Sequence, residues 1–151
     1  RRKEMMIRHA GESDMAQLLL YEHGISREEL GNSIKAGRVL VLLEGDTLVG
    51  WLRYNLFWDN TPFLNMLYVL EPYRGKGYGT MLVGHWEAEM AAGGYGRVLT
   101  STLSNELAQH FYRKHGYEDC GALKLPKEPL EILFRKDFPA IMNKRQDRVG
   151  V

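Results

Sequence analysis

The stretch EPYRGKGYGT, residues 71–80, places three glycines at alternate positions beside two basic residues, Arg74 and Lys76. Glycine allows backbone dihedrals and close approaches that a Cβ forbids, and the basic residues favour an anion. Where such a loop leads into a helix, its N–H groups and the helix dipole together form a site for a phosphate group. The stretch therefore predicts a phosphate-binding loop.

The spacing of the glycines separates the known types of phosphate-binding loop. A Walker loop requires Gly-Lys followed by Ser or Thr, whereas Gly75-Lys76 is followed by Gly77. A dinucleotide fingerprint requires G-x-G-x-x-G, and the third glycine here, Gly79, comes one residue too early. Two interpretations remain: the pattern R-x-x-G-x-G, which begins at Arg74, or a glycine-rich turn that binds nothing.

A second pattern follows downstream. Residues 104–119, SNELAQHFYRKHGYED, contain the spacing N-x-x-A-x-x-F-Y-x-x-x-G-Y from Asn105 to Tyr117. Together with VLEPYRGKGYG, this pattern resembles the GNAT superfamily of acetyl-CoA-dependent N-acetyltransferases. The two motifs stand in the order typical of the family, and the resemblance covers most of the chain because the expected order of helices and strands also looks like that fold.

The resemblance implies a coenzyme A site. In the family, the main chain of the glycine loop binds the pyrophosphate, which here corresponds to Arg74, Gly75, Lys76, Gly77, Tyr78, Gly79 and Thr80. The preceding strand, at Leu67, Tyr68 and Val69, would pair through its backbone with the pantetheine arm, as an added strand does. One of its N–H groups could also polarise the thioester carbonyl. Asn105 would bond the pantetheine or cap the following helix.

The resemblance also implies a catalytic role for Tyr112. The family has a tyrosine at this helix position near the thioester sulfur, where its phenol can give a proton or a hydrogen bond to the leaving thiolate. A plain core residue is the alternative, because Tyr112 shares a helical face with Ala108 and His115. We expect Cys120 to be a buried thiol, and because it has no evident base partner, we expect no covalent intermediate.

The general base stays open. An alkyl amine with a pKa of about 10.4 is almost wholly protonated at pH 7, so a base or a desolvating pocket must produce the neutral form. Many family members have a glutamate on the central strand, where this chain has Asn65 and Met66. Asn65 holding a water, Asp59, His110 and His115 are the alternatives. The loops expected to face the acceptor offer Tyr21, Glu22, Trp58 and Asp59, and the expected acceptor-side residues are Trp58, Asp59 and Asn65.

Hydrophobic periodicity and cap residues give the elements that must position these groups. We expect the order βααβββαβαββ in a single GNAT-like α+β domain, with a central mixed, largely antiparallel sheet flanked by helices. The strands are expected at 5–9, within 39–57 (two), and at 63–70, 97–104, 117–125 and 130–136. The helices are expected from Ser13 to His23, from Ser26 to Gly37 with a capping box to Glu29, from Tyr78 to Gly93, and over 108–115.

Composition limits the remaining classes of protein. The 151 residues fit one domain, at 1–137, followed by a tail at 138–151 that is frayed or forms a short docking helix. A net charge of +1 excludes a broad nucleic-acid footprint. One cysteine favours a reducing compartment, and no apolar run is long enough to span a membrane, so we expect a cytoplasmic protein. Because the chain does not begin with methionine, residues 1–4 could come from an expression vector.

These features predict an N-acetyltransferase that moves an acetyl group from acetyl-CoA to a primary amine by direct attack in a ternary complex. We expect a small-molecule or peptide acceptor, no metal, no nucleic acid or membrane partner, and a monomer or homodimer. A non-catalytic module that binds coenzyme A or acyl-CoA is the alternative, since the strand carboxylate is missing. A nucleotide-binding protein is the third class, and titration with ATP, NAD and coenzyme A would distinguish it.

Overall fold

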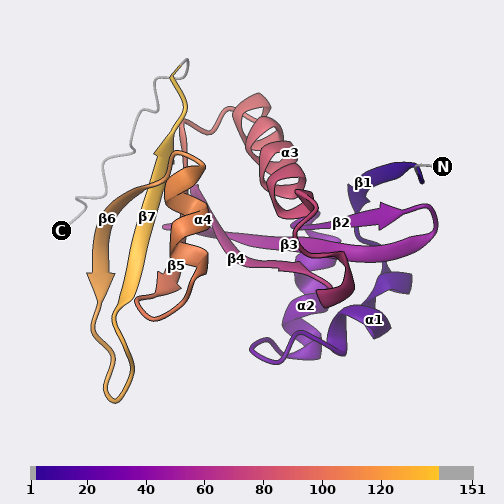
Figure 1. Ribbon diagram of the computed structural model, residues 1–151, viewed down its shortest axis with the longest axis horizontal. Coiled ribbons are helices and arrows are strands. Elements are labelled where there is room, and N and C mark those ends of the chain that lie inside the picture. Colours follow the sequence, from indigo (N-terminus) through magenta and orange to yellow (C-terminus); the bar gives the residue numbers. More distant parts are fainter. Residues whose placement is uncertain (1–2, 140–151) are drawn as a thin grey trace.

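The computed structural model describes residues 3–139, which form a seven-stranded sheet in the order β1-β2-β3-β4-β5-β7-β6 (Figure 1). Among these residues, β4 and β5 are the one parallel pair. The strands are β1 Met5–His9, β2 Val39–Glu44, β3 Thr47–Phe57, β4 Thr61–Val69, β5 Arg97–Leu103, β6 Glu118–Leu123 and β7 Glu131–Asp137. The predicted fold class, a mixed and largely antiparallel sheet with flanking helices, is confirmed.

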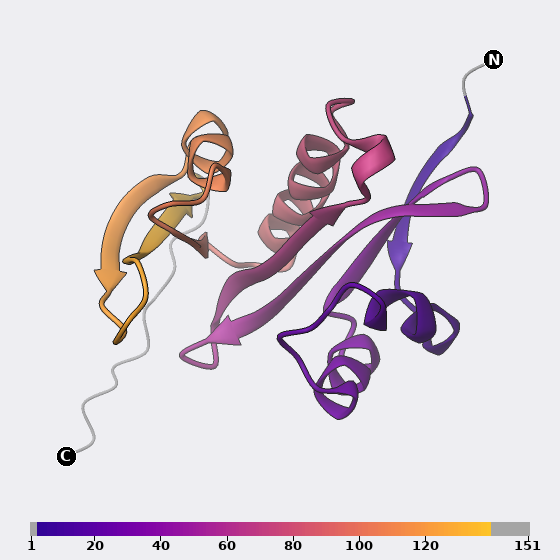
Figure 2. The same cartoon turned by 60° about the horizontal axis from the view of Figure 1, so that its bottom comes forward.

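Helices cover both faces of the sheet (Figure 2). They are α1 Met15–Leu19, α2 Arg27–Lys35, α3 Tyr78–Ala92 and α4 Ala108–Lys114, with 3-10 turns at Glu12–Asp14 and Glu71–Tyr73. Strand β2 is buried on both sides, because Leu40 and Leu42 pack under α3 while Val39 and Val41 pack under α1 and α2. We call the two sides the α1/α2 face and the α3/α4 face.

The sheet divides between β4 and β5. Within the described residues, these strands pair only at Phe63 with Leu99 and Leu64 with Thr100, and then they diverge (Figure 1). The pairing of β3 with β4 shifts by one residue between Arg53 and Tyr54, which leaves Asn65 as an extra residue in β4. Such a bulge bends a strand and increases its twist. One edge of β4 beyond Leu64 is therefore open toward β5.

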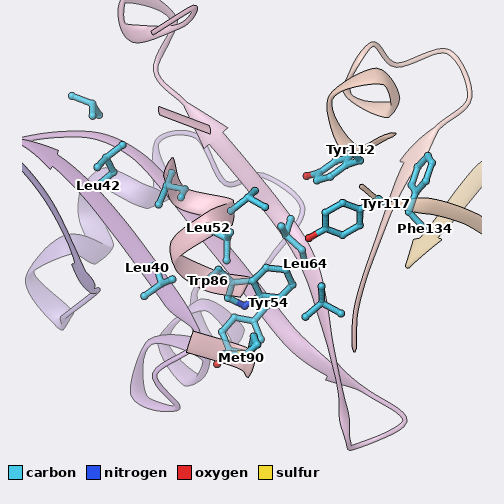
Figure 3. Close-up of a cluster of buried hydrophobic side chains, with 14 residues drawn as sticks. Leu40, Leu42, Leu52, Tyr54, Leu64, Trp86, Met90, Tyr112, Tyr117 and Phe134 are labelled. Carbon is cyan, nitrogen blue, oxygen red and sulfur yellow. The ribbon is translucent and has the colours of Figure 1, made fainter. Parts of the chain in front are cut away.

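The core of the α3/α4 face crosses this division. Figure 3 shows Leu52, Leu64 and Trp86 on one side and Tyr112, Tyr117 and Phe134 on the other. The ring of Phe134 is fully buried, and burial of one such side chain stabilises the fold by roughly 1.5–3 kcal/mol. A polar link adds to this contact. The Tyr117 hydroxyl donates to Glu87 of α3 at 2.7 Å, and Lys136 of β7 donates to the same carboxylate at 2.8 Å.

The first helix differs from the prediction. We expected Ser13 to cap one long helix, but the structure has a 3-10 turn followed by only five α-helical residues. Asp14 organises this turn instead, since its carboxylate accepts from the Gly11 N–H at 2.8 Å and from the Arg8 guanidinium at 2.7 and 3.0 Å. The hydrogen bond from Arg8 is the largest cause that lowers the pKa of Asp14. A side-chain contact with β1 thus sets the start of the helix.

The second helix follows its predicted start and end. The Ser26 hydroxyl accepts from the Glu29 N–H at 3.1 Å, and Gly37 ends the helix with a φ of +73°. Cys120 was expected to be buried, but it is exposed on β6. Within residues 3–139, no helix is both long and apolar enough to cross a membrane. The predicted docking helix of the tail falls on residues 140–151, outside the described part of the chain.

Candidate functional site

The glycine loop connects β4 to α3. Gly75 and Gly77 have φ values of +77° and +82°, in the left-handed region that favours glycine. A Cβ placed on either residue would meet no other atom within 4 Å. Backbone conformation therefore accounts for both glycines, and the main chain of the loop lies open to an approaching group.

The start of α3 offers unpaired donors toward the same place. The first donor within the helix is the N–H of Met81, which bonds the Gly77 carbonyl at 3.0 Å. The N–H groups of Gly79 and Thr80 precede it, so the helix gives them no acceptor. These amides and the positive end of the helix dipole favour a phosphate group.

A hollow of about 260 Å³ lies over this loop and extends to β4 and α4. Its lining is Val69, Tyr73, Arg74, Gly75, Gly77, Tyr78, Gly79, Thr80 and Phe111. Most of these residues come from the stretch that the sequence predicted. Phe111 was part of the second motif but had no predicted role; its ring would lie 3.5 Å from a Cβ on Gly79. This is an ordinary contact distance, so the Phe111 ring of α4 packs against the first turn of α3 beside the hollow.

Of the two basic residues of the loop, Arg74 lines the hollow, and Lys76 lies beside Tyr73, which also lines it. The Arg74 Nε donates to the Val69 carbonyl at 2.8 Å, and its guanidinium lies 5.2 Å from the centre of the Tyr68 ring. The Lys76 Nζ lies 5.6 Å from the centre of the Tyr73 ring. Because both side chains are exposed, water screens their attraction to an anion. Arg74 also fastens the loop to the end of β4.

The open edge of β4 continues from the loop into the sheet. The Leu70 N–H donates to the Val49 carbonyl of β3 at 2.8 Å. Backbone groups alternate in direction along a strand, so the N–H groups of Leu67 and Val69 point away from β3, toward the division between β4 and β5. The backbone of Tyr68 faces β3, and its ring stacks on Trp51 at 4.9 Å. Of the three predicted strand residues, Leu67 and Val69 thus present their amides to the open edge.

Tyr112 lies in the core beside this edge, with 5% of its surface exposed. Burial raises the pKa of Tyr112 to about 12, although a hydrogen bond with the Thr100 side chain acts in the opposite direction. In Figure 3 its hydroxyl points away from Phe134. A thiol has a pKa of about 8.5, so full proton transfer from this phenol to a thiolate would be uphill by roughly 5 kcal/mol. The group is suited to donating a hydrogen bond.

The turn before α4 differs in detail from the prediction. Asn105 is exposed there, and Leu107 holds the position that precedes the helix, so Asn105 does not cap it. The Glu106 carboxylate accepts from the Leu103 N–H at 2.7 Å, and Gln109 donates to the Ser104 carbonyl at 2.9 Å. Side chains of the turn and first helical residues thus organise the turn, and contact with pantetheine stays the predicted role of Asn105.

The two candidate histidines belong to α4 and the residue after it, on the α3/α4 face. His110 is exposed. The His115 ring stacks on Phe111 at 4.2 Å, its Nδ1 bonds the Phe111 carbonyl at 2.7 Å, and its Nε2 bonds the Thr80 hydroxyl at 2.9 Å. His115 therefore connects α4 to the first turn of α3, a contact that the sequence did not indicate.

The predicted acceptor-side residues lie along the β3–β4 hairpin. Trp58 and Asp59 form its turn, with φ values of 56° and 65°. The Asn65 side chain donates to Asn55 at 2.8 Å. The Phe57 ring lies 4.6 Å from Trp58 and 5.7 Å from Phe63, and the side chains of Phe57 and Trp58 are exposed. Asn55 and Phe57 alternate with core residues of the other face, so this group lies on the α1/α2 face.

Glu22 was expected in a loop that faces the acceptor, but its side chain is buried and only 3% of the residue is exposed. Its carboxylate bonds the Arg53 guanidinium of β3 at 3.0 and 3.3 Å. The neighbouring Tyr21 ring lies 5.6 Å from Trp51 and 5.6 Å from Tyr68. This ion pair and these ring contacts hold the connection between α1 and α2 against the sheet. The Glu22 carboxylate is therefore bonded to Arg53 and does not face the acceptor.

Sequence reasoning missed one polar pair on the α1/α2 face. The Ser101 hydroxyl of β5 donates to Glu131 of β7 at 2.6 Å. Val98, Thr100 and Thr102 are buried toward α4, so the alternate residues of β5, including Ser101, point to the opposite face. A lone glutamate late in the chain carries no motif, and only the pairing of β5 with β7 brings it to this face.

The comparisons agree with this architecture. The model of the acetyltransferase (GNAT) family matches residues 8–117. No curated protein matches the chain in sequence. A GNAT-family acetyltransferase from Bacillus cereus is 24% identical, with a TM-score of 0.73 over 89% of this chain and 97% of that one. The PaiA N-acetyltransferase of Thermoplasma acidophilum, solved with coenzyme A, is 19% identical, with a TM-score of 0.74 over 89% and 99%.

A third similar structure comes from Arabidopsis thaliana and contains the bisubstrate analogue CoA-Ac-MVNAL. It is 19% identical, with a TM-score of 0.73 over 89% of this chain and 99% of that one. At these identities the structural likeness establishes the fold, and the family match covers well over half of the chain. The protein therefore belongs to the acetyltransferase (GNAT) family, as the two sequence motifs predicted.

Proposed function

We propose that the protein transfers an acetyl group from acetyl-CoA to a primary amine, by direct attack within a ternary complex. The observation that carries this proposal is the continuity of two backbone sites. The hollow over the glycine loop reaches Val69, and the open edge of β4 begins at the same residue. Such an arrangement suits a ligand with a pyrophosphate at one end and an extended amide-containing arm at the other.

In this proposal, the amides of Gly79 and Thr80 bind the pyrophosphate, and the N–H groups of Leu67 and Val69 pair with the pantetheine arm. The acetyl thioester then lies in the division between β4 and β5. An N–H of the β4 edge that bonds its carbonyl would stabilise the tetrahedral intermediate by about 3–4 kcal/mol. Tyr112 donates a hydrogen bond to the leaving thiolate. The bound coenzyme A of the Thermoplasma acidophilum structure supports this choice of cosubstrate.

The acceptor is proposed to approach from the α1/α2 face, because α3 and α4 cover the other side of the opening. The β3–β4 hairpin offers this acceptor the aromatic rings of Phe57 and Trp58 and the amide of Asn65. An extended acceptor such as a peptide, whose amine lies at the opening while its chain reaches Phe57 and Trp58, suits this surface. The peptide portion of the analogue in the Arabidopsis thaliana structure supports the peptide class.

The test is a thiol-release assay with acetyl-CoA and a panel of polyamines, aminoglycosides, amino acids and short peptides. Release above the background without amine, with acetylated product detected by mass spectrometry, is the expected result. A non-catalytic coenzyme A module is the second candidate, because β4 carries Asn65 and Met66 where a carboxylate is common in the family. Thermal stabilisation by acetyl-CoA with no release from any amine would favour that module. Absence of both signals would contradict the proposal.

A further inference from the structure

In the proposed function, the acetyl group lies between β4 and β5 and the acceptor amine approaches it from the α1/α2 face. A general base for this amine must therefore lie on the same face, close to that position. Asp59 is at the wrong end of β4. Leu67 lies six positions after Thr61, where the strand begins, and at about 3.3 Å per position this is roughly 20 Å. Glu22 is buried and bonded to Arg53. The carboxylates nearest in sequence to the predicted acceptor loops are therefore unsuited to this proton transfer.

Glu131 is at the required level of the sheet. The register pairs Leu64 with Thr100, so Ser101 and Leu103 of β5 follow at the levels of Asn65 and Leu67 as the strands diverge. Glu131 of β7 pairs with Leu103. Its side chain reaches back over β5 to the Ser101 hydroxyl at 2.6 Å, which turns it toward β4 and the opening.

Within residues 3–139, the contacts of Glu131 leave one of its carboxylate oxygens for a substrate. Ser101 bonds Oε1, and the side chain as a whole is half-buried between Leu103 and Leu133 on the same face. The nearest cation of β7 on this face, Arg135, makes its ion pairs with Glu118 at 3.4 Å and Asp137 at 3.9 Å. A carboxylate held in this way can accept a hydrogen bond from an ammonium group and then its proton.

We propose that Glu131 is the general base of the acetyl transfer, a role that rests on the proposed function, and that Ser101 positions it. The carboxylate takes one proton from the acceptor ammonium. The freed nitrogen lone pair forms a bond to the thioester carbon, and the C–O π electrons move to the oxygen. When that carbonyl forms again, the C–S bond breaks and the sulfur leaves with its electron pair. The second nitrogen proton passes to the thiolate, and Glu131 returns its proton to solvent.

The experiment compares Glu131→Gln with Glu128→Gln, a matched change on the same β6–β7 hairpin. Removal of a general base lowers the rate by about 10²–10⁴-fold. At pH 7 we expect kcat/KM for the amine to fall at least 100-fold in the first variant and less than threefold in the second. The dissociation constant of acetyl-CoA stays unchanged in both. Ser101→Ala gives an intermediate loss, and Ser101→Thr, which keeps the hydroxyl, recovers part of it.

The pH profile separates a base from a structural residue. An amine that is already neutral needs no base, so the deficit of Glu131→Gln should shrink steadily as the pH rises toward about 10, the pKa of an alkyl amine. A deficit that is equal at every pH, or a variant with the activity of the original protein, would overturn the role of Glu131 and leave the transferase intact. If the unmodified protein is inactive with every amine, both the proposed transferase activity and this role of Glu131 are wrong.

Discussion

The two sides of the opening between β4 and β5 are built in different ways. On the α3/α4 side, one continuous stretch, from Leu67 to Thr80, forms the open edge and the glycine loop, and its backbone presents the donors. On the α1/α2 side, the polar and aromatic groups come from the α1–α2 connection, the β3–β4 hairpin, β5 and β7. A backbone site depends on local conformation, whereas a side-chain site depends on how distant strands pair.

The largest expected effect tests the backbone site. Gly77→Val should weaken coenzyme A binding at least 100-fold, because the side chain enters the open space over the loop and a β-branched residue disfavours the φ of +82°. Isothermal titration calorimetry with coenzyme A measures this change.

The control for this variant is Gly94→Val. Gly94 follows the C-terminal end of α3 with a φ of +94° and open space around it, so it has the same kind of backbone strain at the opposite end of the helix from the loop. Both variants should lose about 1–2 kcal/mol of stability, but only Gly77→Val should lose the ligand. Equal affinities in the two variants would remove the phosphate site from the glycine loop.

The second largest effect is expected from removal of the Tyr112 hydroxyl beside the opening between β4 and β5. Tyr112→Phe should lower kcat about 10–100-fold and change the dissociation constant of acetyl-CoA less than threefold, because the ring stays and only the donor is lost. Steady-state kinetics and calorimetry give the two quantities.

Tyr117→Phe is the matched change at a neighbouring buried tyrosine. It removes the hydrogen bond to Glu87 and should cost about 1–3 kcal/mol of stability with little change in kcat. If both variants keep the original kcat, Tyr112 is a core residue and nothing more.

The third effect tests the side-chain site. Arg53→Met leaves the Glu22 carboxylate buried without its cation, which destabilises a protein by about 3–5 kcal/mol. Because the α1–α2 connection then loses its hold on β3, we expect the KM of the amine to rise about tenfold while the KM of acetyl-CoA stays within twofold.

The double variant Arg53→Met, Glu22→Leu separates stability from positioning. It removes both charges and should recover most of the stability measured by urea unfolding. A rise in the KM of acetyl-CoA equal to that of the amine would contradict the division of the site into two sides.

The smallest effect on turnover is expected from changes at Cys120. Its thiol is exposed on β6, and partial burial raises its pKa, so no environment there activates it as a nucleophile. Iodoacetamide should modify this residue and leave turnover unchanged, as should Cys120→Ala. Loss of turnover in a folded Cys120→Ala protein would indicate a covalent intermediate and contradict direct attack.

The elements that were predicted correctly from the sequence are those whose ends depend on interactions between residues close together in the chain. Ser26 and Gly37 end α2 as predicted, since a cap needs only residues within a few positions of the helix end. The prediction of the first helix was wrong because Asp14 bonds Arg8 of β1. The sequence pattern of a helix carries no information about such a contact with a strand. The exposure of Cys120 was missed for a similar reason, since β6 is the last strand of the sheet order.

The sequence by itself determined the family, the order of the elements and the place of the glycine loop, because the motifs and the periodicity that indicate them involve residues close together in the chain. Tertiary structure decided the rest. The bulge at Asn65 and the divergence of β4 from β5 open the edge of the sheet. The pairing of β5 with β7 brings Glu131 to Ser101, and the folding of the α1–α2 connection buries Glu22 against Arg53. The side chains of these two pairs are 30 or more positions apart in the chain and come into contact only when the sheet forms, so no local sequence pattern predicts their contacts.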